Sequence, residues 1–316
     1  MSKANRGRMP GASKSAGQKK APGAGQAARR PGQTAHGARE KVAAQRAGAR
    51  RAAARRRVLT VGGCVAVVLA IVIALIGVKL AESPAQAGTA AANPAVARQI
   101  ATVPAATFNT VGRGSATGLK ATSGQPLLTL NGKPEVLYIG GQYCPYCAAE
   151  RWAIAAALSR FGTFSGLQFI HSSATDAYPD TPTLSFANAR YTSKYLAFVP
   201  VEWYGEKPDA STPTGYSYLQ QPTAQQAALF AKYGGSFPFV DIGNRYLVPQ
   251  AQFLPSALAG LSWAQVAAAM HDPSSAVAKD IDGAANMITA AIAKLTHGQP
   301  AAVANSAGVT AAAGSI

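Results

Sequence analysis

Two cysteines separated by two residues form the part of this sequence whose residue types and spacing best support chemistry. Cys144 and Cys147 stand in the sequence Cys-Pro-Tyr-Cys, with Pro145 and Tyr146 between them. A cysteine thiolate attacks disulfide bonds, and a second cysteine close by can resolve the mixed disulfide that forms. The pattern therefore predicts thiol–disulfide exchange, with Cys144 as the attacking thiol and Cys147 as the resolving thiol.

The flanking sequence predicts that the pair lies between a strand and a helix. The apolar run 136–139 is short and is followed by two glycines, as expected of a buried strand. After the pair, Ile154, Leu158 and Phe161 recur at the spacing of one helical face in an alanine-rich stretch. Unpaired N–H groups and the helix dipole favour a thiolate at a helix start, where Pro145 removes a donor that is not needed.

Other uses of a Cys-x-x-Cys pair fit this sequence less well. Zinc takes four ligands, yet the third cysteine, Cys64, lies in a long apolar run and the four histidines have no ligand-like spacing. A c-type haem needs His after the second cysteine, where this chain has Ala148. A structural disulfide remains an alternative, although so small a loop gains little stability from one. We expect no metal and no cofactor other than a redox-active Cys144–Cys147 disulfide.

Positive charge is concentrated at the start of the chain. Residues 1–57 hold 16 Lys and Arg against one acid, which accounts for +15 of the net charge of +17. They contain almost no large apolar residue, so we expect a disordered tail in the cytoplasm. Such a tail favours contact with anionic lipid headgroups or acts as a topology signal. Nucleic-acid binding is the weaker alternative, because no aromatic residues are interspersed to stack on bases.

An apolar run follows the basic tail. Residues 58–78 carry no charge and are 21 in number, enough to span a bilayer core as one transmembrane helix. Arg55, Arg56 and Arg57 directly precede the run, and the positive-inside rule then places the N-terminus in the cytoplasm and the rest of the chain outside. A cleaved signal peptide ending at 85–87, Ala-Gln-Ala, is the alternative.

The remaining sequence predicts one α/β domain with a mixed sheet. We expect a linker at 79–104, the domain at 105–298 and a disordered tail at 299–316. A type II′ hairpin turn is predicted at Gly243-Asn244, between two apolar strands. Further strands are predicted at 167–171 and 195–203, and helices at 223–233, 263–270 and 276–295.

The order of these elements around the Cys-Pro-Tyr-Cys motif and Ser-Phe-Pro-Phe-Val-Asp resembles the thioredoxin superfamily. The sequences Gly-Gly-Gln-Tyr-Cys-Pro-Tyr-Cys-Ala-Ala-Glu-Arg-Trp and Ser-Lys-Tyr-Leu-Ala-Phe-Val-Pro-Val-Glu resemble a family of uncharacterised, membrane-anchored thioredoxin-like proteins. This resemblance covers about residues 100–296. It implies that Pro238 is a cis proline against the catalytic disulfide and that the Phe237 backbone pairs with a substrate chain. The alternative for Pro238 is an ordinary strand-edge proline.

The sequence departs from the superfamily pattern in two places that matter for the site. Thioredoxins have a buried acid on the strand before the motif, where this chain has Tyr138, so the proton acceptor for Cys147 is not identified. An insertion at 172–236, rich in Tyr, Phe and Trp, either shapes a substrate surface or packs as extra core.

These features predict a membrane-anchored, extracytoplasmic thiol–disulfide oxidoreductase with a thioredoxin-like sandwich. Disulfides persist outside the cytoplasm, so the role is that of an oxidase, an isomerase or a reductase of exported cysteine-containing proteins. The expected partners are those proteins and a membrane redox partner that recycles the disulfide. The alternative is a cell-surface binding module on the same scaffold whose disulfide never turns over.

Overall fold

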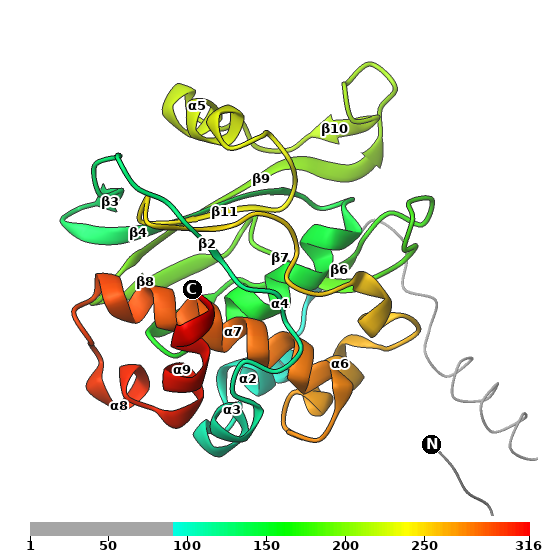
Figure 1. The fold of residues 1–316 in the computed structure, drawn as a ribbon. Helices are drawn as coiled ribbons and strands as arrows, with labels where there is room; N and C mark the ends of the chain where they lie inside the picture. The colour runs from blue at the N-terminus through cyan, green and yellow to red at the C-terminus, as the bar shows by residue number, and fades with distance from the viewer. Residues whose placement is uncertain (1–90) are drawn as a thin grey trace, which may run out of the picture. The chain divides into compact units, whose positions relative to one another are not determined.

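The computed structural model describes residues 91–316 (Figure 1). The predicted basic tail at 1–57, the apolar run at 58–78 and the first part of the linker lie outside the described residues. Within residues 91–316, no helix is both long enough and apolar enough to cross a membrane.

A seven-stranded mixed sheet is built around β4 (Lys133–Gly141), the strand that leads into the cysteine motif. It lies parallel to β9 (Ala197–Pro208) and antiparallel to β11 (Phe239–Ile242). The strand order is β10-β9-β4-β11-β12-β2, with β3 paired to β4. The outer strands are β10 (Tyr216–Tyr218), β12 (Tyr246–Val248), β2 (Lys120–Ala121) and β3 (Thr129–Leu130). The predicted α/β class with a mixed sheet is therefore confirmed.

Helices cover both faces of this sheet because β4 is apolar on both sides. Its even-numbered residues Val136 and Tyr138 pack in the larger core cluster, and Leu137 and Ile139 pack in a smaller one. The larger cluster includes residues of α4 (Pro145–Ser159) and α7 (Ala276–Leu295), and the smaller one touches α5 (Ala224–Lys232). Figure 1 shows α4 and α7 on one side of the sheet and α5 on the other.

Two smaller sheets lie outside the main one. Strand β6 (Gln168–His171) pairs with β1 (Ala91–Ala92) and β7 (Pro182–Ser185). Strands β5 (Gly162–Ser165) and β8 (Arg190–Ser193) pair with each other. The predicted strand at 167–171 therefore forms, but β9 is the parallel neighbour of β4. Strands β9 and β10 lie within the expected 172–236 insertion, so part of that segment belongs to the main sheet.

The predicted hairpin forms between β11 and β12, but its turn type differs from the prediction. Gly243 and Asn244 both have positive φ, at 67° and 56°, and the Arg245 N–H donates to the Ile242 carbonyl at 3.1 Å. A type II′ turn needs positive φ at its first central residue alone, whereas type I′ needs it at both. The prediction of type II′ is wrong, because Asn adopts the left-handed conformation readily enough to fill the second position.

The folded domain extends beyond both predicted boundaries. Within the expected linker, α2 (Pro94–Ala101) buries Val96 and Ile100 in the core. Within the expected disordered tail, α9 (Ala307–Ala312) buries Val309 and packs against α7 and α3 (Ala105–Val111). Both predictions are wrong for the described residues, because small residues can pack closely enough to replace large ones. The remaining helices are α6 (Trp263–Ala269), α8 (Ala301–Ala304), η1 (Pro255–Leu258) and η2 (Ala313–Ser315).

Candidate active site

Cys144 is the N-cap residue of α4, as the sequence predicts. Its backbone is extended, with φ −75° and ψ 121°, and Pro145 is the first residue of the helix. The Cys147 backbone N–H donates to Cys144 Sγ at 3.4 Å. Both cysteines are free thiols. A sulfur at this position receives a hydrogen bond from the first turn and lies at the positive end of the helix dipole.

The two sulfurs differ in exposure and in acidity. Cys144 is 7% exposed, whereas Cys147 is 0% exposed. The hydrogen bond from the Cys147 thiol lowers the pKa of Cys144 more than burial raises it. Burial raises the pKa of Cys147 well above its usual value, and the same hydrogen bond raises it further. Cys144 is therefore the sulfur that carries negative charge more easily, while Cys147 keeps its proton.

An ion pair lies fully buried next to the motif. Arg151 donates from Nε to Glu202 Oε1 at 2.9 Å and from Nη2 to Glu202 Oε2 at 2.7 Å, and both side chains are 0% exposed. Arg151 Nη2 also donates to the Gly141 carbonyl at 2.6 Å, and Glu202 Oε1 accepts the Phe186 N–H at 3.0 Å. The pair therefore joins the end of β4, the helix α4 and the strand β9.

The charge of Arg151 reaches the cysteines. Burial alone would lower the pKa of Arg151, but the adjacent Glu202 carboxylate raises it above its usual value, so the guanidinium stays charged. Arg151 follows Cys147 by four residues and lies on the same face of α4. Beyond the larger effects of burial and hydrogen bonding, its charge lowers the pKa of both Cys144 and Cys147.

The Tyr138 hydroxyl and Cys147 Sγ both lie close to Gly140, which has no side chain. A Cβ atom added to Gly140 would lie 2.1 Å from the Tyr138 hydroxyl oxygen and 3.1 Å from Cys147 Sγ. Tyr138 is fully buried, and its hydroxyl has no hydrogen-bond partner among residues 91–316. Burial raises the pKa of this hydroxyl well above its usual value, so it remains a hydrogen-bond donor.

Aromatic side chains frame the outer side of the motif. The ring of Tyr143 stacks on Tyr216 with centroids 4.0 Å apart, and the ring of Tyr146 meets Tyr178 edge-on at 5.7 Å. The Tyr216 hydroxyl bonds to Ser173 Oγ at 2.6 Å. Tyr146 is 36% exposed. Tyr178, Tyr216 and Ser173 all come from the 172–236 segment, so this segment forms both part of the sheet and part of the site's rim.

The sheet register places Pro238 level with Gly140, four residues before Cys144. Phe239 pairs with Ile139 in antiparallel register, which sets the preceding Pro238 level with Gly140. Pro238 is buried, and the Phe237–Pro238 peptide bond is cis, as the resemblance implies. The Phe237 ring packs against Phe230 at 5.2 Å and Tyr204 at 6.0 Å. Pairing of the Phe237 backbone with a substrate chain stays a prediction.

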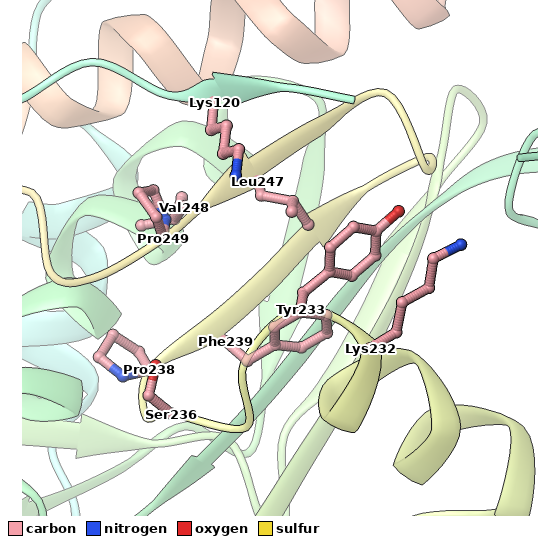
Figure 2. Close-up of a pocket in the computed structure, with 9 residues that line it drawn as sticks. All are labelled: Lys120, Lys232, Tyr233, Ser236, Pro238, Phe239, Leu247, Val248 and Pro249. Atoms are coloured by element: carbon pink, nitrogen blue, oxygen red, sulfur yellow. The ribbon is translucent and has the colours of Figure 1, made fainter. Parts of the chain in front are cut away.

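Pro238 also lines a cavity of about 190 Å³ that neither cysteine lines. Figure 2 shows its walls, which include Lys120 from β2 and Lys232 from the end of α5. Because neither cysteine lines this cavity, it is distinct from the thiol site. No cluster of three or more His, Cys, Asp or Glu residues suited to a metal occurs within the described part of the chain.

Sequence reasoning missed the role of Arg151 and Glu202. Both lie in stretches that resemble the thioredoxin-like family, Ala-Ala-Glu-Arg-Trp and Val-Pro-Val-Glu, but the resemblance implies no role for either residue. The available signal was a charged residue within an apolar run on each element, since such residues are seldom buried without a partner. Spacing along the chain could not show that these two charges meet.

Comparison with known proteins gives a family and no activity. No curated protein and no solved structure matches the chain. The model of one protein family, described as a domain of unknown function, DUF929, matches residues 121–294. That match includes β4, the cysteine motif, Arg151, Glu202 and Pro238, and it spans more than half of the sequence, so the chain belongs to the DUF929 family.

Proposed function

We propose that this chain is a membrane-anchored, extracytoplasmic thiol–disulfide oxidoreductase that uses Cys144 and Cys147. The observation that carries the proposal is the asymmetry of the two sulfurs. Cys144 caps α4 and accepts a hydrogen bond from the Cys147 backbone N–H, and its pKa is lowered, chiefly by the Cys147 thiol. Cys147 is fully buried and has a raised pKa, chiefly through burial. One nucleophilic and one protonated sulfur are what an exchange cycle needs at its start.

We also assign the domain a thioredoxin-like fold. The strands β12-β11-β4-β9 are adjacent in that order, with β4 and β9 parallel and α4 between them in the chain. The cysteine motif follows β4, and Pro238 precedes the antiparallel strand β11. This arrangement supports the resemblance on which the assignment rests.

The cycle that follows uses only these two side chains and a partner with a disulfide or thiols. In the reducing direction, Cys144 attacks a partner disulfide and one partner sulfur leaves with the electron pair. Cys147 then loses its proton and attacks Cys144 Sγ, which forms the Cys144–Cys147 bond and releases the second partner sulfur as a thiol. The reverse sequence oxidises a partner. Oxidase, isomerase and reductase roles all use these steps.

The anchor and the location are part of the same proposal and rest on the sequence. The uncharged run at 58–78 follows a basic tail, so the domain lies outside the cytoplasm with exported proteins and a membrane redox partner. The tail contacts anionic lipid. A reporter that works only outside the cytoplasm should be active when fused after Ile316 and inactive when fused before Val58. The opposite pattern would contradict the location.

Trapping of mixed disulfides tests the catalytic roles. Cys147→Ser should accumulate partner proteins linked to Cys144, because the nucleophile forms a mixed disulfide that no second thiol resolves. Cys144→Ser is the matched control and should trap none, since Cys147 is fully buried and keeps its proton. The measurement is non-reducing electrophoresis of the full-length protein from cells after acid quenching. Equal trapping by both variants would show that the nucleophile is assigned wrongly.

A cell-surface binding module on the same scaffold is the second candidate. The low exposure of Cys144, at 7%, favours it, because a nucleophile must be reached by its target. The aromatic rim around Tyr146 would then be the binding surface. Reactivity separates the two candidates: a Cys144 thiol that resists a small disulfide reagent in the folded protein would favour the binding module.

A further inference from the structure

The buried environment of Cys147 contains two hydrogen-bond donors that the fold leaves without acceptors. The Tyr138 hydroxyl and Arg151 Nη1 are both inaccessible to solvent and lack partners within residues 91–316. A buried donor without an acceptor destabilises the fold, so such groups call for an explanation. The Tyr138 hydroxyl and Cys147 Sγ both lie close to Gly140, and the Arg151 guanidinium carbon lies 5.8 Å from the centre of the Tyr138 ring.

Resolution of a mixed disulfide requires negative charge on Cys147. That sulfur is fully buried, and a thiolate without donors around it would be strongly disfavoured. Thioredoxin-like enzymes meet this requirement with a buried acid, and this chain has a tyrosine on the corresponding strand. A tyrosine that holds its proton cannot accept the proton of Cys147. It can donate a hydrogen bond to the thiolate, as a charged guanidinium can stabilise it through space.

We propose that Tyr138 and Arg151 form a thiolate-stabilising site for Cys147, with Gly140, which has no side chain, leaving room for the Tyr138 hydroxyl near the sulfur. This inference rests on the proposed oxidoreductase function. Cys147 releases its proton to solvent, its sulfur bonds to Cys144 Sγ, and the bond from Cys144 to the partner breaks. The electron pair leaves with the partner's sulfur, which takes up a proton from solvent. Tyr138 acts through Cys147 and is a positioning residue.

The charged and titratable groups around Cys147 come from each element that packs on it. From β4 there is Tyr138, from β9 there is Glu202, and from α4 and the turn before it there are Arg151, Cys144 and Tyr143. Glu202 is held by Arg151 through two hydrogen bonds, so its charge is neutralised where it stands. Arg151 Nη1 and the Tyr138 hydroxyl are therefore the groups left to act on the sulfur.

An aromatic disulfide reagent that releases a coloured thiolate separates the two chemical steps in one experiment. The probe is dithiobis-nitrobenzoate, used with the full-length protein in which Cys64 is replaced by Ala. The first equivalent of nitrothiobenzoate reports attack by Cys144, and the second reports resolution by Cys147. Tyr138→Phe should leave the first release within twofold of the unsubstituted rate. It should slow the second about tenfold, which is about 1.4 kcal/mol, and move its pH midpoint upward by roughly one unit.

Two further variants make the result specific. Tyr191→Phe is the control, since it also removes a tyrosine hydroxyl. That hydroxyl donates to the Leu158 carbonyl at 2.9 Å, away from the cysteines, so its loss should change neither release. Gly140→Ala adds a methyl carbon 2.1 Å from the present position of the Tyr138 hydroxyl oxygen, so the hydroxyl must move, and the second release should slow more than the first. It tests the proposal independently should Tyr138→Phe fail to fold.

The outcomes distinguish the inference from the function beneath it. A normal first release with an unchanged second release and pH profile in Tyr138→Phe and Gly140→Ala would overturn the role of Tyr138 alone. Equal slowing of both releases would mean a structural effect and would also overturn it. Absence of the first release in the unsubstituted protein would overturn the oxidoreductase function, and the inference with it.

Discussion

At the scale of residues, the chemistry of the site depends on the different acidities that the fold gives to the Cys144 and Cys147 thiols. Cys144 sits at the helix start with a hydrogen bond from the Cys147 thiol, and its pKa is lowered. Cys147 lies one helical turn further in, and burial raises its pKa well above the usual value. The hydrogen bond between the sulfurs therefore lowers the pKa of Cys144 and raises the pKa of Cys147.

Removal of the Cys147 thiol should make Cys144 less acidic. In Cys147→Ala the hydrogen bond that lowers the pKa of Cys144 most is lost, so that pKa should rise. The measurement is the pH dependence of Cys144 alkylation by iodoacetamide in full-length protein with Cys64→Ala. Cys147→Ser keeps a hydroxyl donor and should shift the midpoint less. An unchanged midpoint in Cys147→Ala would show that the helix start alone sets the acidity.

The sequence predicted some of these residues and not others. The cysteine pair was predictable because its spacing has a chemical meaning by itself, and Pro238 because it stands before a strand in a resembling pattern. Arg151 and Glu202 were not, because their meeting depends on how α4 packs over β9. The sequence shows that Tyr138 stands where thioredoxins have a buried acid. It does not indicate that the tyrosine hydroxyl is a hydrogen-bond donor for the site.

At the scale of elements, the Arg151–Glu202 pair holds the helix of the motif against two strands. It is fully buried, and Arg151 also binds the Gly141 carbonyl at the end of β4. Removal of one partner leaves the other charge buried without compensation, whereas removal of both does not. We therefore expect the pair to fix the relative positions of α4, β4 and β9, even if its net contribution to the free energy of unfolding is small.

Arg151→Met should lower the free energy of unfolding by roughly 3–5 kcal/mol, because Glu202 is left buried and unpaired. The double variant Arg151→Met/Glu202→Leu should recover part of this loss. Recovery is incomplete since the Phe186 N–H also loses its acceptor. Urea unfolding followed by circular dichroism measures both. A loss below about 1 kcal/mol in Arg151→Met, a size typical of exposed pairs, would contradict the account.

Helix α7 contains a carboxyl group that should make stability depend on pH. Asp282 is 0% exposed, neither carboxyl oxygen has a partner within residues 91–316, and burial raises its pKa to about 8. A raised pKa in the folded state means that the contribution to stability is fully present below the unfolded value, near pH 4. It is lost as the pH rises through about 8, at no more than about 1.4 kcal/mol per pH unit.

Asp282→Asn keeps the size of the side chain and removes this titration. Its free energy of unfolding should therefore fall less than that of the unsubstituted protein between pH 5.5 and 8, as measured by urea unfolding at several pH values. Some dependence should remain, because burial also raises the pKa of Glu150 to about 7 and that of Asp241 to about 6. The exposed Asp272→Asn is the control and should follow the unsubstituted protein, because hydrogen bonds from Ser274 lower the pKa of Asp272 and keep its titration below this pH range. Parallel curves for Asp282→Asn would contradict the assignment.

The elements themselves were largely predictable, and their pairing was not. Alternating and continuous apolar runs indicated β4, β9 and β11, and the glycine-asparagine turn indicated the hairpin. Local pattern could not decide that β9 and not β6 lies beside β4, because both runs satisfy the same period. The turn type was missed since Asn at positive φ is a choice that sequence alone leaves open.

At the scale of the whole molecule, the described domain is held together by segments far apart in the chain. The N-terminal α2 packs against α4, and the C-terminal α9 packs against α7 and α3. Both were expected to be unstructured, because alanine-rich and glycine-rich sequence is common to linkers and to closely packed small helices. Composition could not separate these cases. The anchor and its topology depend on residues 1–90 and remain predictions from charge and hydropathy.

The equilibrium between the reduced and the oxidised Cys144–Cys147 pair tests the central proposal most directly. Full-length protein with Cys64→Ala should be titrated across glutathione redox buffers, and its free thiols should be counted by mass after alkylation. We expect one reversible two-electron transition with a midpoint between about −120 and −230 mV, in the range of exchange enzymes. A pair that never closes, or a disulfide that no buffer in the series reduces, would contradict a catalytic role for these cysteines.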